Sequence, residues 1–136
     1  MVQGDEPMVN SDMIREVAEP MLNNDKVFVT NLYGKINSNK EFRDLNVVKV
    51  VCDLDGNALY FSREPIPSRF NIKNTGVFKQ YGVIMFQRNI LQEYMQMNPT
   101  PLEKVESVDM LRILEHGLQI KMIVSRYNVY TVDTPS

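Results

Sequence analysis

Apolar side chains recur at helical spacing in the first part of the chain. They follow Asn10 and Ser11, either of which can cap a helix, and they are Met13, Ile14, Val17, Ala18 and Met21. Pro20 lies inside this pattern and lacks the backbone N–H that a continuous helix uses. The pattern therefore predicts a helix that begins near residue 11 and ends or kinks near Glu19.

Two more helices are predicted in the second half of the chain. Residues 88–97 read as a helix ended by Asn98-Pro99, because the residue before a proline resists helical angles. Thr100 can cap the next helix, which starts at Pro101 and is stopped by Gly117. Leucines and valines recur every third residue between these limits, which predicts one helix there.

Runs rich in β-branched and aromatic residues predict the strands. Two of them, 47–54 and 58–61, flank Asp55-Gly56-Asn57, and Asp-Gly between two such runs indicates a β-hairpin. The other predicted strands are residues 26–32, 77–86, 118–124 and 129–132. The polar segments 33–46 and 62–75 are expected to be irregular.

The order of these elements favours an α/β fold with a mixed sheet flanked by helices. The chain has 136 residues, 43% of them apolar, which is enough for one core. We therefore expect a single domain over residues 1–136, with a hairpin excursion near 47–61.

Charge and hydropathy narrow the class of partners. The formal net charge is −2 and no basic cluster stands out, which argues against a nucleic acid partner. No apolar run reaches the roughly 18 residues of a membrane span, and no secretory signal is present. We therefore expect a cytoplasmic protein without membrane contact. The single cysteine, Cys52, lies in an apolar run and is expected to be a small buried side chain.

Two aspartates near opposite ends of the chain are candidate metal ligands. Asp5 lies in Val2–Pro7 and Asp133 lies in Val132–Pro135, and each follows a short strand-like or apolar stretch. Mg²⁺ prefers oxygen ligands and often takes one or two carboxylates together with substrate phosphates. Aspartate is also common in proline-containing turns, where its role is purely structural. Both interpretations, metal ligand and turn residue, stand at this point.

Five motifs occur in order along the chain. They are Val2-Gln3-Gly4-Asp5-Glu6-Pro7, Ala58-Leu59-Tyr60-Phe61-Ser62-Arg63-Glu64-Pro65-Ile66-Pro67, Thr100-Pro101-Leu102-Glu103-Lys104-Val105-Glu106, Leu111-Arg112 and Val132-Asp133-Thr134-Pro135. In these motifs the chain resembles the 3-deoxy-manno-octulosonate cytidylyltransferase family of CMP-sugar synthetases. The resemblance implies a nucleotidyltransferase-like (Rossmann-like) fold. It also implies a reaction in which CTP and an acidic eight-carbon sugar give a CMP-sugar and pyrophosphate.

The resemblance implies roles for individual residues. Asp5 and Asp133 match the family's metal-binding aspartates and are expected to hold Mg²⁺ at the catalytic centre. The residues expected to contact substrate are Gln3, Arg63, Gln80, Glu103 and Glu106. A guanidinium such as that of Arg63 suits a sugar carboxylate. Glu103 and Glu106 are equally well explained by the favourable interaction of acidic side chains with the start of a helix, which needs no ligand. Gln80 is equally well explained as a residue on the surface of a strand.

Two positions depart from the family pattern. Gln80 stands where the family typically has histidine, and Met110 replaces a glutamine. These changes leave open a cytidylyltransferase for another acidic sugar, such as a nine-carbon acylneuraminate.

The family's loop for the CTP phosphates has no counterpart in this sequence. The chain is therefore expected to match the C-terminal half of the family, without the N-terminal nucleotide-binding part, and to be inactive alone. A homodimer is expected. A non-catalytic dimerising fragment is the alternative from a different functional class.

Overall fold

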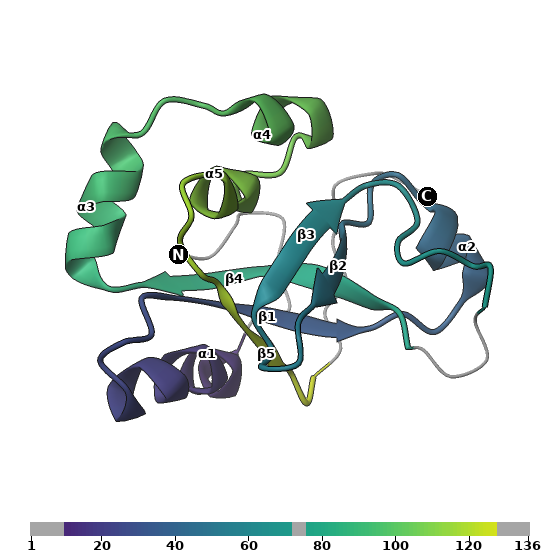
Figure 1. Cartoon of the computed structure of the whole chain (residues 1–136). Helices are drawn as coiled ribbons and strands as arrows, with labels where there is room; N and C mark the ends of the chain where they lie inside the picture. The colour runs from purple at the N-terminus through teal and green to yellow at the C-terminus, as the bar shows by residue number, and fades with distance from the viewer. Residues whose placement is uncertain (1–9, 72–75, 128–136) are drawn as a thin grey trace.

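One five-stranded sheet carries helices on both faces in the computed structural model, which describes residues 10–71 and 76–127 (Figure 1). The strands are β1 (Val29–Lys35), β2 (Lys49–Cys52), β3 (Ala58–Ser62), β4 (Phe78–Phe86) and β5 (Lys121–Val124). The helices are α1 (Ser11–Asn23), α2 (Asn39–Arg43), α3 (Arg88–Gln96), α4 (Pro101–Glu106) and α5 (Met110–Glu115).

The strand order is β3-β2-β4-β1-β5. Strands β1 and β5 are parallel, and the other neighbouring strands are antiparallel. The sequence-based expectation of an α/β fold with a mixed sheet flanked by helices is therefore confirmed.

Each face of the sheet has its own apolar cluster. On one face, Met13 and Val17 of α1 pack with Leu32 of β1 and with residues of β4. On the other face, α3 and α5 pack against Val29 of β1, the hairpin and β5. Val29 and Leu32 belong to different clusters because side chains alternate between the two faces of a strand.

The predicted hairpin is confirmed, and its turn closes over the sheet. Gly56 has a φ of 83°, which only glycine adopts without steric cost, so the turn can form between β2 and β3. The hairpin crosses one face, and its turn reaches the far edge strand β5 (Figure 1), where Asn57 forms a bridge with Lys121. The backbone N–H of Met122 donates to the Gly56 carbonyl at 2.9 Å.

The first helix does not end near Glu19 but continues through Pro20 to Asn23. The Val17 carbonyl, one turn before Pro20, accepts a hydrogen bond from a residue outside the helix. The donor is the hydroxyl of buried Thr30, at 2.6 Å. Packing of the apolar face of α1 on the sheet also outweighs the missing donor of one proline.

Three other element boundaries differ from the sequence prediction. Strand β1 lies three residues later than expected, because pairing with β4 and β5 sets its register. The segment 33–46, expected to be irregular, contains the end of β1 and helix α2, which is capped by the Ser38 side chain. The helix expected from Pro101 to Gly117 is two helices, separated where Ser107 has a φ of 56°. The strand expected at 129–132 lies outside the described residues.

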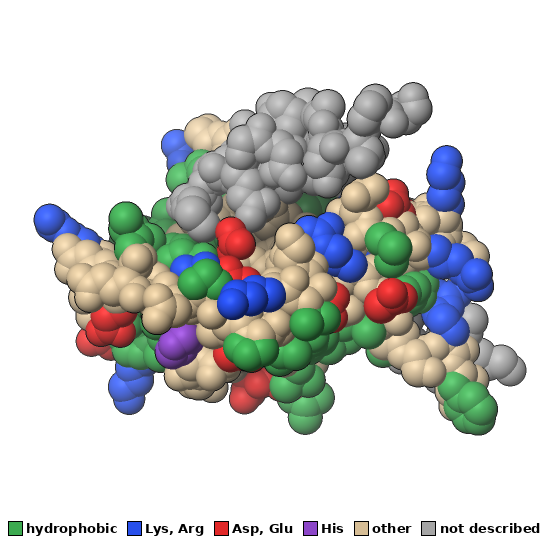
Figure 2. All heavy atoms as spheres, turned by 90° about the horizontal axis from the view of Figure 1, so that it is seen from above, with side chains coloured by type: hydrophobic (Ala, Val, Ile, Leu, Met, Phe, Trp, Pro, Cys, Tyr) green, Lys and Arg blue, Asp and Glu red, His purple; other side chains and the backbone are tan. Residues whose placement is uncertain are grey.

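Charges of both signs are interspersed on the face seen in Figure 2, and no continuous basic stripe crosses it. Among the residues that the structure describes, no helix combines the length and the hydropathy needed to cross a bilayer. Cys52 is half-buried against the cluster under α3 and α5, and burial raises the pKa of its thiol.

Candidate functional site

The fold brings together two of the predicted substrate residues, Arg63 and Glu106. Arg63 directly follows β3, and Glu106 is the last residue of α4. The Glu106 carboxylate accepts the backbone N–H of Arg63 at 3.0 Å and the hydroxyls of Tyr60 and Ser62 at 2.9 Å each. Burial alone would raise the pKa of Glu106, but these hydrogen bonds outweigh it and hold the pKa below its ordinary value.

The guanidinium of Arg63 caps the end of α4. Its Nε donates to the Glu106 carbonyl at 2.6 Å and its Nη2 to the Ser107 carbonyl at 2.8 Å. Its Nη1 donates to the Leu45 carbonyl at 3.2 Å. The last carbonyls of a helix lack partners within the helix and attract cations, so this arrangement stabilises the break between α4 and α5. Of the five N–H groups of a guanidinium, two are not used in these bonds.

A buried lysine supports the same region. Lys49 of β2 is fully buried, and its ammonium group donates to the carbonyls of Asp44 at 2.5 Å and Arg63 at 2.6 Å. Burial lowers the pKa of this ammonium group. Sequence reasoning missed this residue, although a lysine inside the apolar run 47–52 was a signal that a charge is buried there.

We expect Glu106→Gln to lower the free energy of unfolding by about 1 to 3 kcal/mol, because a carboxylate that accepts several hydrogen bonds becomes a neutral amide. Folding lowers the pKa of Glu106, so its contribution is complete above the unfolded pKa and is lost as the pH falls through the folded pKa. Urea unfolding should show the difference at pH 7 and its loss in acid. The exposed control Glu93→Gln should change little at either pH.

Glu103 lies on the same helix as Glu106 but its side chain has different partners. Its two carboxylate oxygens accept Nε and Nη2 of Arg112 at 2.8 and 2.6 Å, and Oε1 also accepts the backbone N–H of Thr100 at 3.1 Å. The Arg112 guanidinium lies over the Tyr94 ring, 4.8 Å from its centroid. This ion pair joins α3, α4 and α5, so Glu103 has a structural partner besides the helix dipole.

Gln80 lies in β4, and its side chain meets β1. Its Nε2 donates to Oδ1 of Asn31 at 2.7 Å. Gln80 pairs with Tyr33, whose side chain packs on the cluster under α3 and α5, so Gln80 lies on that face of the sheet.

Gln3, Asp5 and Asp133 lie outside the described residues. The described residues nearest to them in the sequence meet at α1. Asp12 accepts the hydroxyl of Tyr127 at 2.9 Å, and Glu16 accepts the Ser125 hydroxyl at 2.8 Å. The first helix therefore holds the segment that follows β5. Within 10–71 and 76–127, no group of three or more metal-ligating side chains is found.

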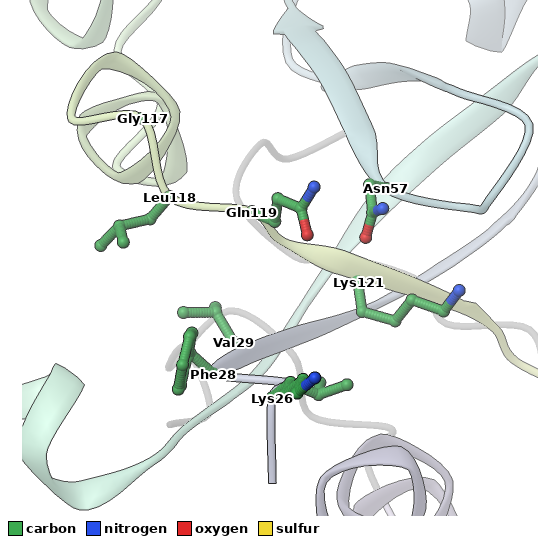
Figure 3. A pocket seen from close by; sticks show the side chains of 9 residues that line it. Lys26, Phe28, Val29, Asn57, Gly117, Leu118, Gln119 and Lys121 are labelled. Carbon is green, nitrogen blue, oxygen red and sulfur yellow. The ribbon is translucent and has the colours of Figure 1, made fainter. Parts of the chain in front are cut away.

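A cleft of about 190 Å³ lies at the other end of β3 from Arg63. Figure 3 shows the carboxamides of Asn57 and Gln119 facing each other, with an apolar wall formed by Phe28, Val29 and Leu118. Arg63, Gln80, Glu103 and Glu106, the predicted site residues that the structure describes, do not line this cleft. It is therefore separate from the region around Arg63.

Comparison with known proteins decides the family. A sequence profile described as cytidylyltransferase matches residues 1–121. The chain belongs to the cytidylyltransferase family. A chain of known structure, a CMP:2-keto-3-deoxy-manno-octonic acid synthetase complexed with CTP, superposes with a TM-score of 0.89. It is 32% identical, and the match covers 98% of this chain and 55% of that one.

Curated cytidylyltransferases are similar along nearly the whole chain. The 3-deoxy-manno-octulosonate cytidylyltransferase of Geotalea daltonii is 37% identical over 98% of this chain, and that of Fusobacterium nucleatum is 38% identical over 98%. These matches cover 57% and 54% of the two relatives. This cytidylyltransferase chain thus spans about half the length of the curated relatives that it matches.

Proposed function

We propose that this cytidylyltransferase chain takes part in CMP-sugar synthesis, in which CMP passes from CTP to 3-deoxy-manno-octulosonate and pyrophosphate is released. The observation that carries the proposal is the match over 98% of the chain to curated relatives that bear this name. The fold similarity to a synthetase complexed with CTP supports it. A cytoplasmic location follows from the proposal, because CTP is a cytoplasmic substrate.

Within this proposal, Arg63 and Gln80 contact the acid sugar, and Gln3 lies near the nucleotide and sugar. The two N–H groups of Arg63 that its backbone contacts do not use are available for the sugar carboxylate. Glu106 and Glu103 contribute to the substrate site through the contacts that hold Arg63 and α4 in place.

Asp5 and Asp133 are the residues that would hold Mg²⁺. A metal ion there would neutralise the charge that develops on the phosphate oxygens during transfer. The contacts of α1 with residues 125–127 support the proposal, because they join the described segments that lie closest in the sequence to the two aspartates.

A homodimer is also part of the proposal. Large apolar side chains that are exposed on the hairpin and on α4 suit a contact with a second copy, and they are Leu54, Leu59 and Val105. A chain that dimerises without catalysis remains the alternative from another class.

An acylneuraminate is the alternative substrate. Two sequence departures pointed to it, but the Met110 side chain is 1% exposed and lies in the core under α5. Gln80 is therefore the departure that still bears on sugar identity.

The experiment is a titration of the purified chain with the octulosonate, an acylneuraminate and CTP with Mg²⁺, together with an assay of pyrophosphate release. Release that requires CTP, Mg²⁺ and the octulosonate together would establish the whole reaction. Binding of the octulosonate without release would assign the sugar-binding part to this chain. Dimerisation with neither binding nor release would support the non-catalytic alternative and contradict the proposal.

A further inference from the structure

Two charged side chains of opposite sign hold the backbone of Arg63. Its N–H donates to the Glu106 carboxylate at 3.0 Å, and its carbonyl accepts the Lys49 ammonium group at 2.6 Å. Hydrogen bonds with a charged partner are stronger than those between neutral groups. The backbone of Arg63 is therefore fixed, although this residue lies just outside β3.

The end of the ladder between β2 and β3 explains why a side chain holds this carbonyl. Lys49 pairs with Ser62, which is the last residue of β3. Arg63 follows directly after this pair, in the irregular segment that leaves the strand. The side chain of Lys49 thus extends the hold of β2 on the chain by one residue.

The same ammonium group joins Arg63 to the segment that precedes β2. Lys49 also donates to the Asp44 carbonyl at 2.5 Å, and Nη1 of Arg63 donates to the carbonyl of the next residue, Leu45, at 3.2 Å. Residues 44 and 45 therefore contact both the ammonium group of Lys49 and the guanidinium of Arg63. Lys49 keeps the two backbone segments on either side of this guanidinium at a fixed separation.

Stability alone does not account for a charge at this position. Lys49 is fully buried, and the cost of removing its ammonium group from water lowers its pKa. An apolar side chain of similar volume would avoid that cost. It would not bond the two carbonyls, so the position of Arg63 between them would no longer be specified.

We propose that Lys49 is a positioning residue that acts through Arg63 and presents the unused hydrogens of its guanidinium to an anionic group of the substrate. Nη1 and Nη2 each donate one bond at the surface of the protein, so one hydrogen remains on each nitrogen. This inference rests on the proposed function, in which the anion is the carboxylate of the acid sugar. Lys49 itself is buried and does not touch the sugar.

The positioning role is tested without ligand. In ¹H–¹⁵N spectra of the chain, the Nε–H of Arg63 should exchange slowly with water, because it is bonded to the Glu106 carbonyl. Lys49→Met should speed this exchange by about tenfold or more, whereas the Nε–H of Arg112, which is bonded to Glu103, should be unchanged. Unchanged exchange at Arg63, or an equal increase at both arginines, would overturn the positioning role.

Lys79→Met is the matched control. Lys79 pairs with Lys49 in the neighbouring strand β4, and its ammonium group bonds to Glu41 at 2.7 Å. This variant should leave the exchange at Arg63 as in wild type. Because a substitution in the core can prevent folding, Lys49→Gln is measured as well and should also speed the exchange at Arg63. A chain that folds with neither substitution of Lys49 would overturn a role confined to Arg63.

The contribution to the sugar site is tested with the octulosonate and its amide, in which a neutral carboxamide replaces the carboxylate. We expect wild type and Lys79→Met to bind the octulosonate about tenfold more tightly than the amide, because a charged partner strengthens the bonds from Arg63. Lys49→Met should lose most of this preference. In an Arg63→Met background, adding Lys49→Met should not change it further, because Lys49 acts through Arg63.

The outcomes separate this inference from the proposed function. If wild type prefers the octulosonate and Lys49→Met keeps the same preference, the inference is overturned and the proposed function stands. If wild type binds no octulosonate at all, the proposed function fails, and the assignment of Lys49 to a sugar site fails with it. The exchange measurements still decide in that case whether Lys49 positions Arg63.

Discussion

Arg112→Met is expected to lower the free energy of unfolding by about 3 to 5 kcal/mol, because it leaves the carboxylate of Glu103 buried without its cation. Glu103 is 7% exposed, and both of its oxygens accept hydrogen bonds from Arg112. The variant also removes the cation from the face of Tyr94 and the donor to the Met97 carbonyl. Urea unfolding monitored by circular dichroism measures the loss.

The pH dependence gives a second readout for the same pair. The hydrogen bonds from Arg112 hold the pKa of Glu103 below its ordinary value in the folded protein. The stabilisation is therefore complete above the unfolded pKa and disappears as the pH falls through the folded pKa. In Arg112→Met, the stability should no longer fall in this way as the pH is lowered. The double variant Arg112→Met with Glu103→Gln should recover part of the stability, because no buried charge then remains.

An exposed ion pair provides the matched control. Arg15 and Asp12 approach to 3.7 Å on α1, with 81% and 50% of their side chains exposed. Arg15→Met should change the stability by at most about 1 kcal/mol, because surface pairs contribute little. A loss of similar size in Arg15→Met and Arg112→Met would contradict the assignment of the Glu103–Arg112 pair as a buried structural ion pair.

Asn31→Leu is expected to lower the free energy of unfolding by about 2 to 4 kcal/mol, because buried carbonyls lose their donor while the side-chain volume stays similar. The cause lies in an irregular pairing of β1 with β4. The pairs run from Asn31 with Ile84 to Tyr33 with Gln80, so Leu32 alone is opposite residues 81–83. One residue cannot pair with three, and the Asn31 side chain donates to the carbonyls of Tyr81 and Val83 at this irregularity.

The control for Asn31→Leu is Asn89→Leu, on the exposed side of α3. This variant should stay within about 0.5 kcal/mol of wild type. Thermal unfolding of the two variants side by side makes the comparison. If Asn31→Leu is as stable as Asn89→Leu, the carbonyls of the bulge do not depend on Asn31.

Sequence reasoning located the elements whose signals are local. The hairpin was found because Asp55-Gly56 needs only its own turn geometry, and the start of α4 because Thr100-Pro101 is a local cap. Strand β4 and helix α3 were found within one or two residues of their predicted limits. The family motifs, which are also local in sequence, identified the cytidylyltransferase family before the comparison did.

The roles of the charged site residues could not be read from the sequence. Arg63 and Glu106 are 43 positions apart, and their mutual contacts exist only once β3 lies beside α4. The break at Ser107 depends on the same contacts, so the spacing of leucines and valines wrongly predicted one helix from Pro101 to Gly117.

The sequence by itself determined the α/β class, the hairpin, most helices and the family, because propensities, caps and motifs act over a few residues. Only the tertiary structure decided which partners the polar side chains have, namely those of Arg63, Glu103, Glu106 and Gln80. It also decided that Lys49 and Asn31 are buried. The continuation of α1 beyond Pro20 likewise depends on the tertiary structure. The physical reason is that a buried polar group must find its partner wherever the fold places one, however distant in sequence.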